Sequence, residues 1–254
     1  MISRYGWIRD QPSQEPWLDH KALGAKLGKT PDRTNNRKFV TSSYDQGDES
    51  SCTANSDLGA QNYLRTVLKM PKQDLSRQFL YYATRSLEGT VKSDCGASIS
   101  DTQIAAAKFG VCHEKLWPYS KPFSVKPSAE AYSQALDHQV LVKMPVQQMQ
   151  EALETVLAAK QPLHYGMTVY RSFESNETAR TGIVRMPRRF FDSAVGGHAL
   201  WLFDYDRIKR LFYGQNSWDP KEWGTDGLCL FSIPYDYILD PDYAADFWTF
   251  TKVE

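Results

Sequence analysis

The sequence predicts an α+β protein with a helical front half and a strand-rich back half. Between residues 51 and 160, apolar residues return near the 3.6-residue period of amphipathic helices. From Leu163 onwards, short aromatic and β-branched runs are separated by Gly, Pro and Asp, a pattern typical of antiparallel strands. Because the two kinds of element do not alternate along the chain, a doubly wound parallel sheet is disfavoured.

The first 44 residues are rich in Pro, charged and amide side chains, and their few apolar anchors are Trp7, Trp17 and Leu18. We expect an extended segment with few regular elements, packed on the body either as a strap across two lobes or as a short blocking arm. The predicted division is an N-terminal segment (1–44), a helical lobe (45–135) and a strand-rich lobe (136–254), which together form one unit.

Four helices are expected. They cover about 51–68, 76–87, 100–109 and 146–160. Pro71 and Pro162 follow the first and last of them, and Ser100 or Asp101 can cap the third before Gly110 ends it. The apolar face of the last helix is predicted to consist of Met149, Leu153, Val156 and Leu157.

Five strands are expected in the back half, at about 163–169, 198–203, 210–215, 228–233 and 247–251. Their aromatic and β-branched content favours a pleated, half-buried sheet.

Charge and composition exclude several classes of protein. The 30 basic and 30 acidic side chains cancel, which argues against binding to nucleic acid or an anionic membrane. No run approaches the roughly 20 apolar residues that cross a bilayer, and the N-terminus lacks the apolar run of a secretory leader. We therefore expect a soluble cytoplasmic monomer without cofactors, which acts in its own cell or in one into which a leaderless route delivers it.

Four residues in separate stretches could form a nucleophilic site. A thiol in the first turn of a helix, such as Cys52, is favoured as thiolate by unpaired backbone N–H groups. An imidazole from a distant strand can share its proton if a third group orients the ring, and His198 and Asn216 fit these two roles. The side-chain N–H of Gln46, with the backbone N–H of Cys52, can stabilise a tetrahedral oxyanion.

These motifs resemble those of papain-like cysteine peptidases, especially the branch with Ser-Cys-Thr-Ala-Asn around the nucleophile. Gln46 and Cys52 match the glutamine-to-cysteine spacing of that family. His198, in Gly-Gly-His-Ala, follows Cys52 by 146 residues, within the expected separation of about 130 to 150. Asn216-Ser217-Trp218 matches the asparagine motif, and the order of motifs holds over roughly 44–250.

The resemblance implies a helical left lobe carrying Cys52 and a barrel-like right lobe carrying His198 and Asn216, with substrate extended in the cleft between them. It implies that Trp218 shields the histidine–asparagine hydrogen bond from water. It also assigns substrate contact to the backbone near Gly96 and Ala97, while Gly197 leaves the opposite wall open.

The sequence departs from the family pattern near the nucleophile and in the right lobe. Ser50 stands where glycine is usual, Glu49 and Thr53 replace the common flanking residues, and Asp204 and Asp219 replace glycines. Inward-pointing Asp48 and Glu49 would oppose thiolate formation, so both are expected to face solvent.

The expected activity is hydrolysis of peptide bonds through a thioester acyl-enzyme. Two alternatives stay open: a transferase or narrow protein-cleaving effector that uses the same residues, and a catalytically weak peptide-binding module. Cys95 and Cys112 are not predicted to pair or to bind metal, since no Cys-x-x-Cys accompanies them. The histidines other than His198 are assigned structural or surface roles.

Overall fold

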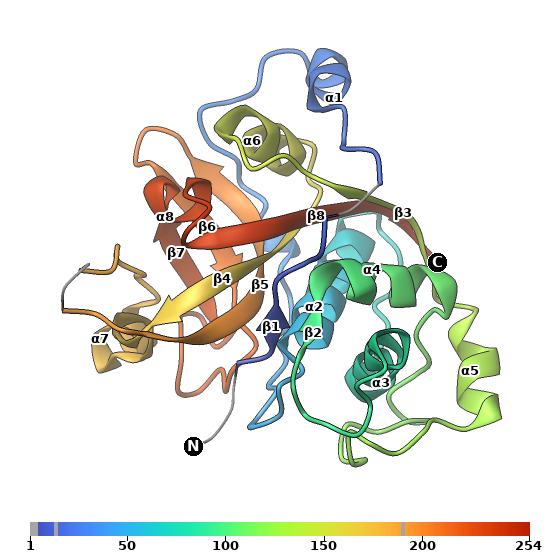
Figure 1. Ribbon diagram of the computed structural model, residues 1–254. Helices are drawn as coiled ribbons and strands as arrows, with labels where there is room; N and C mark the ends of the chain where they lie inside the picture. Colours follow the sequence, from blue (N-terminus) through green and yellow to red (C-terminus); the bar gives the residue numbers. More distant parts are fainter. Residues whose placement is uncertain (1–4, 13–14, 189–190) are drawn as a thin grey trace.

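The computed structural model describes residues 5–12, 15–188 and 191–254. The helices between residues 52 and 135 form one lobe, called the left lobe here although it is drawn on the right side of Figure 1. An open six-stranded sheet with further helices packed on it forms the other, the right lobe. The six strands have the order β3-β8-β4-β5-β6-β7, and every neighbouring pair is antiparallel. The predicted α+β class is confirmed, but the sheet does not close into a barrel.

The helices are α1 (His20–Leu27), α2 (Cys52–Val67), α3 (Arg77–Glu88), α4 (Ile99–Lys108), α5 (Ala129–Ala135), α6 (Gln150–Ala158), α7 (Asn176–Thr181) and α8 (Tyr235–Leu239), with short 3-10 turns η1 (Arg37–Phe39) and η2 (Arg171–Glu174). The strands are β1 (Trp7–Ile8), β2 (Ala97–Ser98), β3 (Val140–Pro145), β4 (Leu163–Tyr170), β5 (Ala194–Asp206), β6 (Leu211–Gln215), β7 (Leu230–Pro234) and β8 (Ala244–Val253).

Helix α2 is central to the left lobe, because α3 and α4 pack against it on one side and β5 on the other. It is buried from Cys52 to Arg65, so its many polar side chains must find partners inside the protein. The next two helices are capped by serines whose side chains accept backbone N–H bonds. The cap of α4 is Ser98 and not Ser100 or Asp101, because the helix starts earlier than predicted.

Strand β4 shows why the right lobe has two different faces. Alternate residues of the strand enter the apolar core of this lobe: Leu163, Tyr165, Met167 and Val169. The residues between them, including His164 and Gly166, point to the opposite face and therefore towards the left lobe. This period of two puts polar and glycine positions of β4 at the interface of the lobes.

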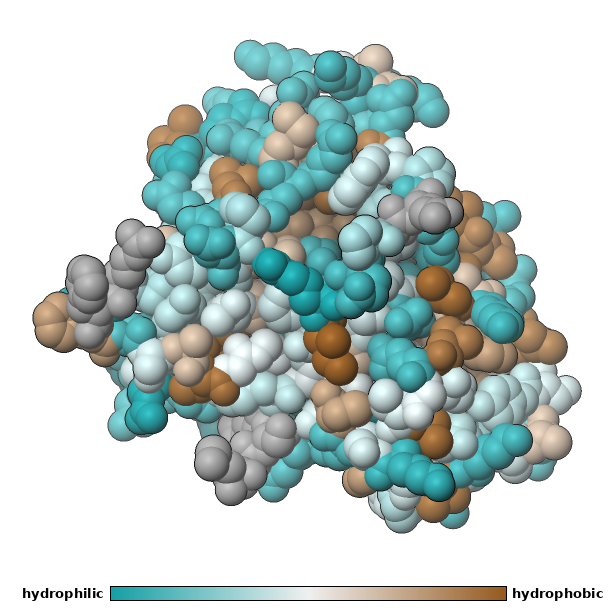
Figure 2. All heavy atoms as spheres, viewed as in Figure 1, coloured by the Kyte–Doolittle hydropathy of each residue, from teal (hydrophilic) through white to brown (hydrophobic). Residues whose placement is uncertain are grey.

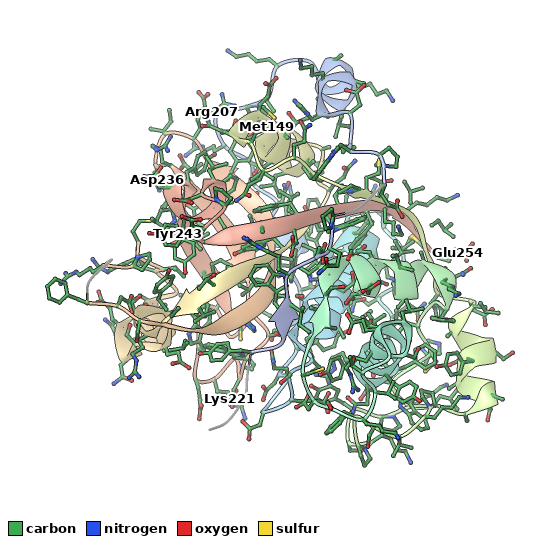
Figure 3. All side chains as sticks on the ribbon, in the orientation of Figure 1. Met149, Arg207, Lys221, Asp236, Tyr243 and Glu254 are labelled. Carbon is green, nitrogen blue, oxygen red and sulfur yellow. The ribbon has the colours of Figure 1, made fainter. Side chains whose placement is uncertain are left out.

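The predicted helix at 146–160 is too long. Helix α6 begins only at Gln150, and Met149 is 41% exposed at its start (Figure 3). Residues 146–149 stay outside the helix: the backbone N–H of Val146 donates to Phe247 O, and that of Met149 donates to Gln147 O. The helices α1, α5, α7 and α8 and strand β3 were not predicted, since each is too short or too polar for its period to stand out.

The N-terminal region is less irregular than expected. Asp19 caps α1 by accepting from the backbone N–H of Ala22, and α1 packs against α6. Leu18 enters the right-lobe core, and the amide of buried Asn36 donates to Leu157 O and Phe203 O, both at 2.9 Å. Residues 18–40 therefore strap the right lobe, while residues 1–4 and 13–14 of the predicted segment lie outside the described residues.

The surface seen from the same side carries apolar side chains in small separate groups, among mostly hydrophilic ones (Figure 2). Among the described residues, none of the helices is long and apolar enough to pass through a membrane.

Candidate active site

Cys52 is the first residue of α2, and its sulfur lies against β5. The backbone N–H of Ala199, next to His198, donates to Cys52 Sγ at 3.4 Å. The side chain is completely buried. The fold thus brings a residue of the left lobe and a strand of the right lobe together at one sulfur atom.

His198 lies on β5, and Asn216 directly follows the adjacent strand β6. Their side chains form a hydrogen-bonded pair. His198 Nε2 lies 2.7 Å from Asn216 Oδ1, which also accepts the backbone N–H of Ser217 at 2.8 Å. Because that atom accepts from Ser217, it is the amide oxygen, and the neutral imidazole must carry its proton on Nε2. The lone pair of Nδ1 is then the basic site of the ring.

Trp218 covers this pair as the resemblance implies. Its ring lies 5.3 Å from the His198 ring with an interplanar angle of 33°, and only 3% of the residue is exposed. Phe173 and Trp223 pack edge-on against Trp218. An aromatic cover lowers the local dielectric and strengthens the histidine–asparagine hydrogen bond.

Gln46 lies beside the first turn of α2, with both ends of its amide oriented. Its Oε1 accepts from Ser217 Oγ at 2.8 Å, and its Nε2 donates to Glu49 O at 2.9 Å. The hydroxyl of Tyr119 donates to the Gln46 carbonyl at 2.9 Å and fixes the loop. Ser217 and Tyr119 were missed as orienting residues, although Ser217 lies within the Asn216-Ser217-Trp218 motif.

The positions predicted to contact substrate are covered by residues 5–8 of the same chain, which run between the two lobes (Figure 1). Strand β1 pairs in parallel with β2, and Ala97 donates its backbone N–H to Gly6 O at 2.7 Å. A Cβ atom added to Gly96 would lie 2.1 Å from that oxygen, and one on Gly197 would lie 2.6 Å from Trp7 O. The wall at Gly197 is therefore closed by this segment.

The segment also covers the nucleophile. The backbone N–H groups of Ala199 and Gly6 both donate to the Cys52 sulfur and lower its pKa. Burial outweighs them and raises the pKa of the thiol to about 11. The lowered pKa predicted for a thiol in the first turn of a helix is thus not found in this state. The reason is that residues Tyr5–Ile8, the covering segment, exclude water from the Cys52 sulfur.

Trp7 anchors the segment in a pocket of the right lobe. A Cβ atom added to Gly166 would lie 2.0 Å from the nearest atom of the Trp7 ring. This ring packs against the apolar cluster that contains Cys52. Trp7 Nε1 donates to Asp246 Oδ2 at 2.9 Å. Asp10 extends the anchor by accepting from the backbone of Ser100 at 3.0 Å. The sequence singled out Trp7 as an anchor but did not reveal its partner.

The departures near the nucleophile have separate outcomes. Asp48 is exposed as expected. Glu49 is not: it is half-buried and accepts from Gln78 Nε2 at 3.0 Å, and burial raises the pKa of its carboxyl to about 7. Ser50 is buried, and its backbone oxygen lies so close to Gly6 that a Cβ there would approach within 1.9 Å.

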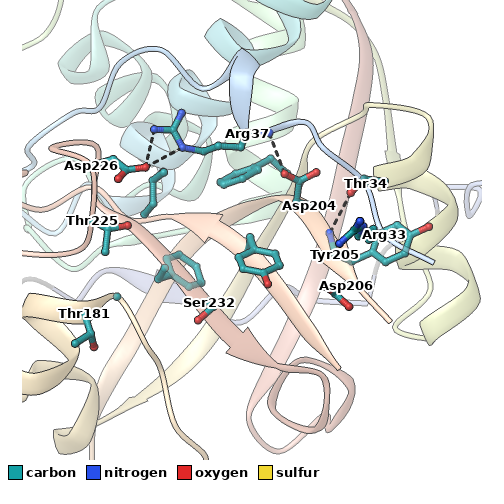
Figure 4. A pocket seen from close by; sticks show the side chains of 15 residues that line it. Arg33, Thr34, Arg37, Thr181, Asp204, Tyr205, Asp206, Thr225, Asp226 and Ser232 are labelled. Atoms are coloured by element: carbon teal, nitrogen blue, oxygen red, sulfur yellow. Dashed lines mark hydrogen bonds and ion pairs between the residues drawn. The ribbon is translucent and has the colours of Figure 1, made fainter. Parts of the chain in front are cut away.

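Asp204 has a structural role away from Cys52. Its carboxylate accepts the backbone N–H groups of Asn36 and Arg37 at 2.7 and 2.9 Å and holds η1 against β5 (Figure 4). Asp204 lines a cavity of about 400 Å³ that also includes Asp226, which pairs with the Arg37 guanidinium at 2.9 Å. None of the four candidate catalytic residues lines this cavity.

All four cysteines are free: Cys52, Cys95, Cys112 and Cys229. Within the described part of the chain, no group of three or more His, Cys, Asp or Glu side chains could hold a metal ion. His113 and His138 contact each other edge to face with ring centroids 4.8 Å apart, whereas His164 is completely buried in a polar cluster.

Comparison with known proteins agrees with this geometry. The sequence model of one family, papain family cysteine protease, matches residues 28–235. A peptidase C1-like protein of Acanthamoeba polyphaga mimivirus, itself uncharacterized, is 34% identical over 234 residues, which cover 85% of this chain and 73% of that protein.

Solved structures give the same result. The crystal structure of xylellain, a cysteine protease from Xylella fastidiosa, superposes with a TM-score of 0.89 at 32% identity, covering 100% of this chain and 97% of that one. Procathepsin B S9 from Trypanosoma congolense shares the fold, with a TM-score of 0.72 at 16% identity over 89% of this chain and 80% of that one.

The fold and the site define a cysteine endopeptidase, a hydrolase whose substrates are peptides or proteins. The chain belongs to the papain family of cysteine proteases.

Proposed function

We propose that the protein hydrolyses peptide bonds through a thioester acyl-enzyme, with Cys52 as the nucleophile. The observation that carries this proposal is a pair of contacts on neighbouring residues of β5. The Ala199 N–H donates to Cys52 Sγ, and His198 Nε2 lies 2.7 Å from Asn216 Oδ1. This arrangement leaves the basic Nδ1 atom of a neutral, oriented imidazole as the group that can receive the thiol proton.

In the proposed reaction, Cys52 transfers its proton to His198 Nδ1 and attacks the scissile carbonyl carbon. The Cys52 N–H and Gln46 stabilise the oxyanion, and His198 returns the proton to the leaving amine. Water, deprotonated by the same imidazole, then attacks the thioester and releases the acid. Asn216 keeps the ring oriented through both steps.

We further propose that the state described here is latent. Gly6 presents its N–H group to the Cys52 sulfur. Because this group is not a carbonyl carbon, the thiol has no electrophile to attack. The Gly6 carbonyl oxygen accepts the backbone N–H of Ala97. Activity then requires that Tyr5–Ile8 leave the cleft, and the uncovered thiol regains water and the favourable field of the α2 N-terminus.

Substitution of the nucleophile tests the proposal. We expect Cys52→Ala to abolish hydrolysis of casein and of fluorogenic peptides, both in the full chain and in a Trp7→Ala chain with a loosened segment. An epoxide probe should label Cys52 in the Trp7→Ala chain, and His198→Ala should remove the labelling. Cys95→Ser, which alters an exposed thiol, is the matched control and should change neither readout.

Three results would contradict the proposal. Parental hydrolysis by Cys52→Ala would exclude the thioester route. Peptide binding without turnover or labelling in the Trp7→Ala chain would instead favour a peptide-binding module, and products joined to an amine in mass spectrometry would favour a transferase.

For location we propose a reducing compartment such as the cytoplasm. The four free thiols, one of them exposed, support it, since disulfides are rare in such compartments. Fractionation of the native cells would test this.

A further inference from the structure

A second polar cluster lies one helical turn beyond Cys52, at the interface of the two lobes. It consists of Ser56 and Asp57 on α2, Gln103 on α4 and His164 on β4. Each side chain is at most 2% exposed. The reaction proposed above uses none of them, although buried polar groups are costly unless they are fully hydrogen-bonded.

The direction of the hydrogen bonds follows from the acceptors. Ser56 Oγ donates to the backbone oxygen of Cys52 at 2.8 Å, with Thr53 O as a second acceptor at 3.2 Å. Since its only proton is used there, Ser56 must accept from His164 Nε2, which lies 2.6 Å away. The imidazole therefore carries its proton on Nε2.

The Nδ1 side of the His164 ring completes the series of hydrogen bonds. Gln103 Nε2 lies 3.2 Å from His164 Nδ1 and 2.5 Å from Asp57 Oδ1, so its two hydrogens serve one acceptor each. Gln61 donates to the second Asp57 oxygen at 2.7 Å. Between Gln103 and Cys52 every bond then points the same way, towards the carbonyl of the nucleophile, and such aligned bonds strengthen one another.

Serine, histidine and aspartate together suggest a second hydrolytic site, but the geometry excludes it. The Asp57 carboxylate is 3.7 Å from His164 Nδ1, and Gln103 bridges the two. Ser56 is buried and its proton is held by the backbone of its own helix. No substrate can reach this hydroxyl without separating the lobes.

We propose that Ser56 and His164 are positioning residues that hold the first turn of α2, and with it the sulfur and N–H of Cys52, against the right lobe. This inference rests on the proposed function, because it assigns the two residues a role in the reaction of Cys52. It links β4 to the nucleophile directly and lets a right-lobe residue control a left-lobe one.

The neutral imidazole suits this role. Burial lowers the pKa of His164 to about 3, and burial raises the pKa of Asp57 to about 7. The ring therefore stays uncharged above about pH 3, with the same donor and acceptor atoms.

Kinetics of variants in the Trp7→Ala chain test the proposal. We expect Ser56→Ala to lower kcat by about ten- to a hundredfold, since a small displacement of reacting atoms has effects of that size. KM should stay within about twofold, because uniform binding is not lost. His164→Phe should act similarly, and His164→Gln, which keeps an N–H donor near the Nε2 position, should restore most of kcat.

Thr84→Val is the matched control. Thr84 is a buried hydroxyl that donates to Leu80 O at 2.9 Å on α3, in the same manner as Ser56 on α2. It should lower the melting temperature comparably but leave kcat unchanged. A kcat for Ser56→Ala equal to that of Thr84→Val would overturn the proposal.

Two measurements keep the inference separate from the proposed function. Nitrogen NMR of the His164 ring in the parent chain should show a neutral imidazole protonated on Nε2, and the opposite tautomer or a charged ring would overturn the positioning chain. If the Trp7→Ala chain does not hydrolyse peptides, the proposed function fails, and the rate of Cys52 alkylation by iodoacetamide replaces kcat. Equal alkylation rates in that chain and its Ser56→Ala variant would then reject the positioning role by themselves.

Discussion

Two imidazoles lie on the same side of α2, one helical turn apart, and we propose opposite roles for them. His198 on β5 lies near Cys52 and is oriented by the amide of Asn216, whereas His164 on β4 contacts Ser56 and is oriented by the amide of Gln103. Both rings are completely buried in this state. Residue types and hydrogen-bond partners alone thus do not distinguish a catalytic cluster from a structural one.

The difference lies in what covers each ring and in which nitrogen remains basic. The covering group at His198 is a terminal segment, and Tyr5 lies 6.3 Å from the ring. His164 is covered by helices α2 and α4, which cannot leave without unfolding the lobe. At His198 the amide of Asn216 binds Nε2, and we propose Nδ1 as the acceptor of the thiol proton, while at His164 the amide of Gln103 contacts Nδ1.

The largest expected effect comes from substituting the two histidines of this comparison. His198→Ala removes the general base and acid, and kcat in the Trp7→Ala chain should fall by about a thousandfold or more. His164→Gln should keep most of kcat, because its donor is retained. The measurement is steady-state hydrolysis of a fluorogenic peptide, and similar losses in the two variants would mean that both rings act by holding structure.

Gln46→Ala is expected to have the next largest effect. Loss of one oxyanion donor costs roughly two to three orders of magnitude in turnover. Because the Gln46 side chain also accepts from Ser217, Gln46→Glu is a useful companion that keeps this acceptor but loses the N–H donor. Single-turnover acylation should fall in both variants, and normal acylation by Gln46→Glu would remove Gln46 from the oxyanion site.

How much of this comparison the sequence could predict depends on the range of the interactions. The long helices α2 and α3, the strands β4 to β8 and the order of Gln46, Cys52, His198 and Asn216 follow from periodicity and motif spacing. The role of His164 does not, since its alternation in β4 indicates only which face it occupies. Its partners lie 61 and 108 residues away along the chain.

The covering segment was beyond sequence analysis for a related reason. Gly166 and Gly197 leave space for Trp7, but a glycine in a strand does not indicate which side chain fills that space. The two readings of the N-terminus, strap and blocking arm, both have a counterpart in the structure: residues 18–40 pack on the right lobe, and Tyr5–Ile8 covers Cys52.

Trp7→Ala sharpens the contrast between a removable and a fixed cover. Loss of the partly buried ring and of its hydrogen bond to Asp246 should weaken docking by roughly 1 to 3 kcal/mol. Peptide hydrolysis by the full chain should then rise by about tenfold or more, since 1.4 kcal/mol changes a population tenfold. Trp17→Ala removes an indole that is 56% exposed in the same region and should have little effect. Equal activities of the parent and Trp7→Ala chains would show that the segment does not limit access.

The smallest expected effect concerns pH, and it follows from the two carboxylates that anchor the segment. Burial and the nearby Asp246 raise the pKa of Asp10 to about 6, and burial also raises that of Asp246, with Arg9 as the only described cation that opposes it. A free aspartate titrates near 3.9, so between about pH 4 and 6 only the docked form holds its proton. Docking is therefore strongest below about pH 4 and weakens as pH rises to about 6, beyond which Asp10 contributes no further change.

The activity of the parent chain divided by that of Trp7→Ala at each pH should rise several-fold across this window, because the division removes the titration of the catalytic pair itself. Asp10→Asn, which cannot ionise, should flatten the rise, and a ratio that instead increased towards acid would show that protonation opens the cleft.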